Sequence, residues 1–119
     1  MLYIKLENIM DITYKTKHLQ KCAEDAKYSL KHLGANNSDT YTKRITQLAS
    51  ADTLEDLRHA PGNFHDLTGN RKGQWACSLD KNYRIVFEPH EDPIPTNDSG
   101  QYIWCEIKGV EIDDIVDYH

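Results

Sequence analysis

Residues 63–75, NFHDLTGNRKGQW, combine one histidine with two adjacent cations. An imidazole titrates near neutral pH, so His65 is a candidate for proton transfer, although a histidine that merely ends a strand has the same local sequence. Arg71 and Lys72 lie between two glycines, which indicates the exposed tip of a hairpin loop. The same side chains are also suited to binding nucleic-acid phosphates without sequence preference. Both interpretations of this stretch stay open.

The charge of the whole chain limits what this stretch can bind. The formal net charge of the 119 residues is −5. Residues 1–50 carry eight lysines and arginines against five acids, whereas residues 106–119 carry five acids against Lys108 alone. A protein that binds free nucleic acid over a broad surface is normally basic throughout. Any contact with a polyanion must therefore be local.

The cysteines and histidines form no disulfide or metal pattern. Cys22, Cys77 and Cys105 are odd in number, widely spaced and without a CxxC pair, so we expect three reduced core residues. None of the six histidines has another histidine four positions away, the spacing that places two ligands on one helical face. The sequence predicts no bound metal and no cofactor.

Nothing in the sequence indicates export or membrane insertion. It has no run of about 18 apolar residues, and residues 1–7 are too short and too charged for a signal peptide. We expect a cytoplasmic protein without a membrane partner. Met10 is a second candidate start, so residues 1–9 are interpreted as a candidate N-terminal extension and residues 10–119 as a single domain.

The first half of the chain is predicted to be helical after a short strand at residues 10–14. Apolar or small residues recur with helical spacing from Thr16 to Leu33, and lysines fill the opposite face. Gly34 is well placed to end this helix. Ser38 or Asp39 can cap a second helix, so the four residues from the glycine onward would form the turn of an antiparallel helical hairpin.

The strongest local pattern is QWACSLDKNYRIVFE, which predicts a β-hairpin over residues 74–88. With residues 80–82 as the loop and Asn82 in the left-handed conformation, apolar residues face one another across the two strands. The predicted pairs on that face are Leu79 with Tyr83, Cys77 with Ile85, and Trp75 with Phe87. The same register places Arg84 beside Ser78 on the opposite face, away from the core.

The remaining segments complete an α+β fold. Residues 88–100 are polar and broken by prolines, as in an exposed loop. Alternation resumes over residues 102–108, which predicts a strand, and Gly109 would mark a bend before the final strand. The order β-α-α-β-β-β predicts an antiparallel twisted sheet packed on one face by the helical hairpin, with Arg84 on the open face.

Three blocks in fixed order, LTGNRKGQW, YRIVF and the closing VDYH, resemble the RelE/ParE superfamily of bacterial type II toxins. Within it the chain is similar to the HigB-like branch, the host-inhibition-of-growth or killer proteins. The resemblance covers most of the chain from Met10 onward, including the helical hairpin. It implies an α+β toxin of the RelE-like fold.

The resemblance also implies an activity. Toxins of this branch enter the ribosomal A site and cleave translated mRNA without a metal: the ribose 2′-OH attacks the adjacent phosphate and leaves a 2′,3′-cyclic phosphate and a 5′-hydroxyl. This chemistry needs a base, an acid and cationic donors for the phosphorane. The catalytic residues implied are His65, Arg84, Tyr118 and His119. The candidate contacts to RNA are Arg71, Lys72, Asn82 and Asp117.

The implied roles follow the matched positions. His65 fills the histidine position of the H-x-L-x-G block and is a candidate acid or base. Arg84 matches the arginine of YRIVF, and the hairpin register independently places it on the open face. Tyr118 and His119 match the closing DYH, where Asp117 would favour the protonated imidazole that an acid requires. For Asn82 the predicted turn is a sufficient explanation without a function.

One position departs from the family pattern. The better-known ribonucleases of the branch have lysine in H-x-L-K-G, where this chain has Thr68, so one positive charge is absent from the implied site. Two other functions stay open: a ParE-like poison of DNA gyrase without RNA cleavage, and an inactive module that binds its partner and represses its own operon. The acid–base set favours the ribonuclease, since a gyrase poison has no need of it.

The resemblance implies three partners. One is a small HigA-like antitoxin with a helix-turn-helix DNA-binding domain, and the others are the ribosome and its mRNA. The acidic C-terminal segment argues against direct sequence-specific DNA binding by this chain.

Overall fold

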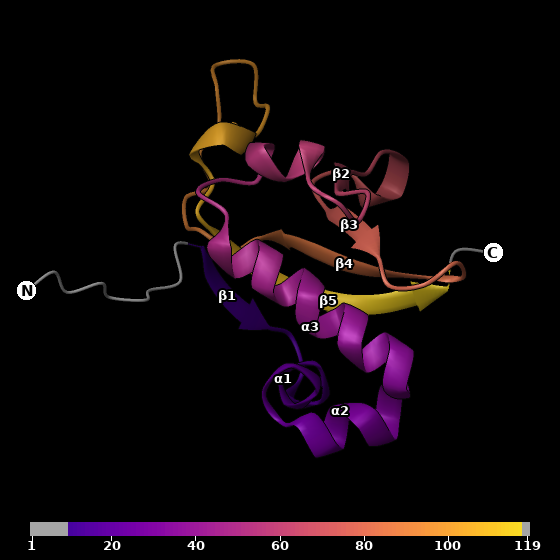
Figure 1. Cartoon of the computed structure of the whole chain (residues 1–119). Helices are drawn as coiled ribbons and strands as arrows, with labels where there is room; N and C mark the ends of the chain where they lie inside the picture. The colour runs from indigo at the N-terminus through magenta and orange to yellow at the C-terminus, as the bar shows by residue number, and fades with distance from the viewer. Residues whose placement is uncertain (1–9, 118–119) are drawn as a thin grey trace, which may run out of the picture.

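The computed structural model describes residues 10–117 and shows one sheet with the helices gathered on one side (Figure 1). The helices are α1 (Lys17–Glu24), α2 (Ala26–Leu33) and α3 (Ala35–Ser50). The strands are β1 (Asp11–Tyr14), β2 (His65–Asp66), β3 (Trp75–Ser78), β4 (Tyr83–Pro89) and β5 (Gly109–Asp117). Short 3-10 helices, η1 (Glu55–His59), η2 (Gly69–Arg71) and η3 (Trp104–Glu106), lie in the connections. The predicted α+β class is confirmed, and none of the described helices is long and apolar enough to cross a membrane.

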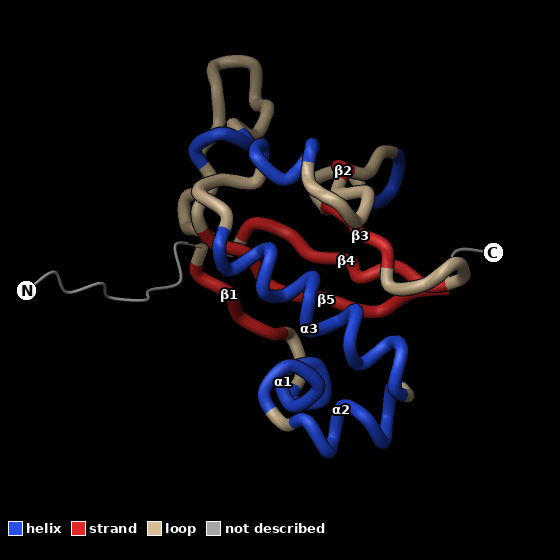
Figure 2. Tube along the Cα trace, in the orientation of Figure 1, coloured by secondary structure: helices blue, strands red, loops and turns tan. Residues whose placement is uncertain are grey.

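The sheet has the strand order β1-β5-β4-β3-β2 (Figure 2). From β5 to β3 the neighbouring strands are antiparallel, as predicted, and β2, which was not among the predicted strands, adds a further antiparallel pair. β1 instead pairs parallel to β5, with Asp11 opposite Gly109, so the expectation of a purely antiparallel sheet is corrected at this edge. A parallel pair needs a long connection, and here the helices and the other three strands supply it.

The core lies between the sheet and the helices. Tyr41 and Leu48 of α3 and Ile85 and Phe87 of β4 have no exposed surface and belong to one apolar cluster. The Tyr41 hydroxyl donates to the Leu19 carbonyl at 2.9 Å, which ties α3 to α1. Burial raises the pKa of Tyr41 well above its ordinary value, so the hydroxyl keeps its proton and remains a donor.

The helix predicted from residue 16 to residue 33 is two helices. Asp25 interrupts it with φ −120° and ψ 106°. The Asp25 carboxylate accepts hydrogen bonds from the backbone N–H groups of Lys27 and Tyr28, each at 3.1 Å. Aspartate is a favoured N-cap because it satisfies such orphan donors. The sequence prediction missed this break because a capping aspartate and an ordinary polar residue look alike on an exposed face.

The turn between α2 and α3 is a single residue. Gly34 has φ 82°, a conformation that favours glycine, and it ends α2 as predicted. However, α3 begins at Ala35 rather than after a cap at Ser38 or Asp39, so that predicted boundary is wrong. Ser38 lies inside α3, where its hydroxyl donates to the buried Ser29 hydroxyl at 2.7 Å and joins the two helices.

The β3–β4 hairpin has the predicted register. The observed pairs include Trp75 with Phe87, Ala76 with Val86, Cys77 with Ile85, and Ser78 with Arg84. The turn differs, because Asn82 is not left-handed. The Asp80 carboxylate accepts from the backbone N–H groups of Asn82 and Tyr83, each at 2.7 Å, and from the Asn37 amide at 2.9 Å. These hydrogen bonds, first that from Asn37 and then that from Asn82, lower the pKa of Asp80. The charged Asp80 carboxylate thus holds the turn.

The segment before β5 departs most from the prediction. Residues 102–108, expected as a strand, contain the η3 turn, and Cys105 is exposed rather than part of the core. The rings of Tyr102 and Trp104 lie edge to face with centroids 5.5 Å apart, and Trp104 lies edge to face on Trp75 at the same distance. Aromatic packing onto the core replaces the strand that the alternation predicted.

The second face of the sheet, opposite the helices, carries an acidic cluster of Glu88, Glu111 and Asp113. One carboxylate oxygen from each residue lies within 4.8 Å of those from the other two. A bulge in the β4–β5 ladder leaves Asp113 without an opposite residue, and the Gln74 amide donates to its carboxylate at 2.9 Å. Burial is the main reason that the pKa values of Glu111 and Asp113 are raised, and neighbouring carboxylates add to it.

The substitution Asp25→Ala tests the break between α1 and α2. Loss of the two capping hydrogen bonds is expected to lower the free energy of unfolding by about 1 kcal/mol. Urea denaturation followed by circular dichroism measures the change. Lys27→Ala keeps the cap and removes an exposed charge from the same helix, so an equal loss in both variants would contradict the capping role.

The substitution Glu111→Gln tests the acidic cluster. Because the folded state raises the pKa of Glu111, it binds the proton more tightly than the unfolded state, and stability falls as the pH rises from the ordinary pKa through the raised one. The variant should therefore melt at a higher temperature than the parent at neutral pH, and at the same temperature below the ordinary pKa of glutamate. Thermal unfolding at both pH values measures this. Glu106→Gln, outside the cluster, should change neither value.

Candidate functional site

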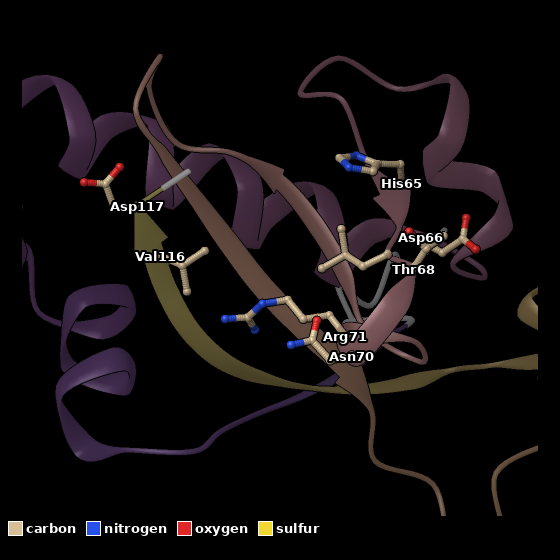
Figure 3. Close-up of a pocket in the computed structure, with 8 residues that line it drawn as sticks. His65, Asp66, Thr68, Asn70, Arg71, Val116 and Asp117 are labelled. Carbon is tan, nitrogen blue, oxygen red and sulfur yellow. The ribbon is translucent and has the colours of Figure 1, made fainter. Parts of the chain in front are cut away.

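A hollow of about 430 Å³ opens on the second face of the sheet, between β2, η2 and the end of β5 (Figure 3). Its lining residues are His65, Asp66, Leu67, Thr68, Asn70, Arg71, Val116 and Asp117. Three of these, His65, Arg71 and Asp117, are site residues predicted from the sequence. Thr68 is the position at which the chain departs from the family pattern. The fold therefore brings together residues from the first and last of the three sequence blocks.

The β2–β3 hairpin builds one wall of the hollow. The chain reverses through η2 between Gly69, with φ 66°, and Gly73, with φ 98°, both conformations that favour glycine. Arg71 is therefore on the exposed tip of a hairpin, as predicted. Its guanidinium donates to the Gln74 side chain at 3.1 Å, and Figure 3 shows it directed toward Val116 across the hollow. The tip residue thus also faces the candidate site.

His65 begins β2 and is half-buried. Its Nδ1 lies 2.8 Å from the carbonyl oxygen of Asn63, which can only accept, so Nδ1 carries the proton. In the neutral ring the lone pair is then on Nε2. Asn63 has φ 55°, a left-handed conformation that asparagine tolerates better than most residues. The backbone therefore selects the tautomer in which Nε2 can accept a proton.

Arg84 lies on the second face, as predicted, beside the hollow rather than in its lining. It is opposite Val116 of β5, which does line the hollow. Its Nη1 donates to the carbonyls of Asp80 and Tyr83, each at 3.3 Å. Arg84 and His65 are two strands and two residues apart. With strands about 4.8 Å apart and a rise of about 3.4 Å per residue, their Cα atoms are separated by about 12 Å.

The other predicted residues lie elsewhere. Lys72 follows η2 and lines a neighbouring hollow instead of this one. Asn82 is in the β3–β4 turn, where its backbone N–H donates to Asp80. Tyr118 and His119 lie outside the described residues. Of the six predicted residues within the described part of the chain, the structure groups three and places Arg84 beside them.

Asp66 lines the hollow and was missed by the sequence reasoning. Its carboxylate accepts from the Arg58 guanidinium at 2.7 Å, and Arg58 also contacts Glu55 at 2.9 Å. Burial alone would lower the pKa of Arg58, but the two carboxylates outweigh it and raise the pKa. Pairing with Arg58 offsets a negative charge that would repel a phosphate from the hollow. The sequence could not predict the ion pair between Arg58 and Asp66, because the chain between them bends at Pro61 and Gly62 and has no helical or strand periodicity.

Among the described residues, the acidic cluster is the one group of three or more carboxylate, histidine or cysteine side chains close enough together to hold a metal ion. Its oxygen atoms are the donor type that hard divalent cations prefer. None of its three residues lines the hollow around His65.

Comparison with known proteins identifies the relatives of the chain. Residues 8–98 match the family model described as "RelE-like toxin of type II toxin-antitoxin system HigB". The match ends before β5 and so does not include Asp117. Toxin HigB-1 of Vibrio cholerae serotype O1 is 31% identical over 80 residues, which are 66% of this chain and 83% of that protein.

Two solved structures match over most of the chain. The YoeB/ParE toxin from Agrobacterium tumefaciens is 14% identical with a TM-score of 0.47, over 92% of this chain and 100% of that one. The YoeB-YefM complex from Staphylococcus aureus matches with 17% identity and a TM-score of 0.43, over 92% of this chain and 97% of that one. The family itself is established by the sequence match, which extends over most of the described residues: the chain belongs to the HigB-like family of RelE-like toxins of type II toxin–antitoxin systems.

Proposed function

We propose that this toxin is a ribosome-dependent endoribonuclease that cleaves translated mRNA without a metal. The observation that carries the proposal is the hollow lined by His65, whose Nε2 can accept a proton, and by Arg71, with Arg84 beside it on the same face. These groups are a proton acceptor and two cations around a space that admits a phosphodiester. A gyrase poison or an inactive binding module would have no need of a proton acceptor there.

Each step of the reaction is assigned to a side chain. Nε2 of His65 accepts the proton of the 2′-OH, whose oxygen bonds to phosphorus while the bond to the 5′-oxygen breaks. Arg71 and Arg84 donate N–H groups to the negative charge of the phosphorane. By the family resemblance, His119 supplies the proton to the 5′-oxygen and Tyr118 completes the site. The products are a 2′,3′-cyclic phosphate and a 5′-hydroxyl.

The charge of the chain supports the proposed dependence on the ribosome. The chain has a net charge of −5, and the acidic cluster lies on the same face of the sheet as the hollow. A protein with this charge binds free RNA weakly because few phosphates can be neutralised at once. An mRNA already held by a ribosome requires only local contacts at the scissile phosphate. We therefore propose that the toxin acts in the cytoplasm on ribosome-bound mRNA.

The proposed protein partner is a HigA-like antitoxin with a helix-turn-helix domain. The family description places the chain in a toxin–antitoxin system. DNA binding is assigned to the antitoxin, since β5 and the acidic cluster make this chain a poor ligand for the DNA backbone.

Expression of the toxin without its antitoxin, followed by mapping of mRNA 5′ ends, tests the ribonuclease. Growth arrest with new 5′-hydroxyl ends inside reading frames is expected. His65→Ala and Arg84→Ala should each lower the cleavage rate on purified ribosomes by about 100-fold or more, because each removes a group that acts on the reacting atoms. Lys27→Ala, an exposed substitution in α2, is the control. Arrest with intact transcripts and altered DNA supercoiling would instead favour a gyrase poison.

Thr68→Lys tests the departure from the family pattern. Thr68 lines the hollow, so a lysine there adds a cation within reach of a bound phosphate. A hydrogen bond to a charged group contributes about 1.5–3 kcal/mol, and the variant should therefore cleave about 10-fold to about 100-fold faster. Asn70→Lys adds the same charge at another point of the same hollow. An equal gain in both variants would mean that position 68 has no specific role.

A further inference from the structure

A second hollow, of about 340 Å³, adjoins the first, and Asp66 and Leu67 form part of the lining of both. Its other side chains are those of Lys72, Gln101, Tyr102 and Trp104. This volume is near the lower end of the range for small-molecule sites, roughly 300–1,000 Å³. We propose that the second hollow binds a base of the RNA strand next to the scissile phosphate. The inference rests on the proposed ribonuclease function and names a specificity site for it.

Tyr102 supplies a flat surface for such a base. Its half-buried ring lies edge to face on Trp104, with the ring planes at 85°, and Trp104 lies on the fully buried Trp75 at 73°. The core therefore fixes the orientation of the Tyr102 ring. A Cβ atom on Gly73 would lie 3.4 Å from the ring, so the hairpin tip passes close beside it. Aromatic rings held in this way are the usual stacking platforms for unpaired bases.

Lys72 and Gln101 supply polar contacts at the edge of the hollow. Both side chains are exposed. The Asn97 amide donates to Oε1 of Gln101 at 3.1 Å, which orients the NH2 group of Gln101 as a donor. Acceptor atoms on the edge of a base suit that donor, and the Lys72 ammonium suits the adjoining phosphate. This gives Lys72, predicted as an RNA contact, a place beside the first hollow instead of inside it.

The shared wall favours one continuous strand over two separate ligands. Asp66 stands between the hollows, and its pairing with Arg58 at 2.7 Å offsets its negative charge. Two adjoining hollows with a cation and a proton acceptor in one and an aromatic ring in the other match the alternation of phosphate and base along RNA. Tyr102 and Trp104 lie beyond residue 98, where the family match ends, so the inference rests on the contacts of these side chains and not on the match.

A nuclear magnetic resonance titration of the full chain tests the inference with two probes. One is a 2′-O-methyl dinucleotide, which cannot be cleaved, and the other is the same molecule with one base removed. We expect the intact probe to shift the Trp104 indole signal and to bind Tyr102→Ala between about 5-fold and about 100-fold more weakly than the parent. The abasic probe should bind both proteins equally. Tyr28→Ala removes an aromatic ring outside both hollows and is the matched control.

Several results would overturn the inference. One is equal affinity of the parent for the two probes, which requires no variant and so does not depend on the folding of Tyr102→Ala. Another is equal affinity of the parent and Tyr102→Ala for the intact probe. Cleavage of ribosome-bound mRNA distinguishes the two proposals. Unchanged cleavage positions and rate in Tyr102→Ala would overturn the base site alone, whereas an inactive parent would overturn the ribonuclease and the base site with it.

Discussion

The packing of the Trp75 indole is the interaction on which the site depends. The ring is fully buried, and the Arg58 guanidinium lies 4.6 Å from its centroid. The Trp104 ring also packs on it, with the two ring centroids 5.5 Å apart. Through Arg58 the core holds Asp66, and through Trp104 it holds Tyr102. Removal of a buried tryptophan costs about 3–5 kcal/mol, and a close-packed interior transmits small shifts instead of absorbing them. The two hollows are therefore fixed relative to each other by one side chain that lines neither.

The sequence predicted well those elements whose signal is local. The β3–β4 register follows from alternation and a turn, both contained within a few residues, and Gly34 ends a helix because of its own backbone freedom. The break at Asp25 was not predictable in this way, since capping depends on one polar residue among many. The η3 turn depends on contact with Trp75, a residue distant in sequence, and the parallel β1–β5 pair likewise has no local signal.

The candidate site shows the same division. His65 and Arg71 were identified from residue type within one block, and the hairpin register placed Arg84 on the correct face. The ion pair between Asp66 and Arg58 could not be found, because the chain between them bends at a proline and a glycine and carries no periodicity. Residue type also cannot separate Arg71 from its neighbour at position 72, since one step along a hairpin tip turns a side chain toward a different hollow.

The distribution of charge over the second face bears on how an acidic protein could handle RNA. The acidic cluster lies toward the end of β4 and the start of β5, whereas Arg84 lies at the opposite end of β4, near the hollow of Arg71. A phosphate chain crossing this face is repelled at one end and attracted at the other, which favours one orientation of approach. At physiological ionic strength such fields extend only about 8 Å. Under the proposed function they need to act only on an mRNA that a ribosome already holds against the protein. Under the proposed function, the negative net charge is compatible with a phosphate-cleaving site because the ribosome delivers the substrate.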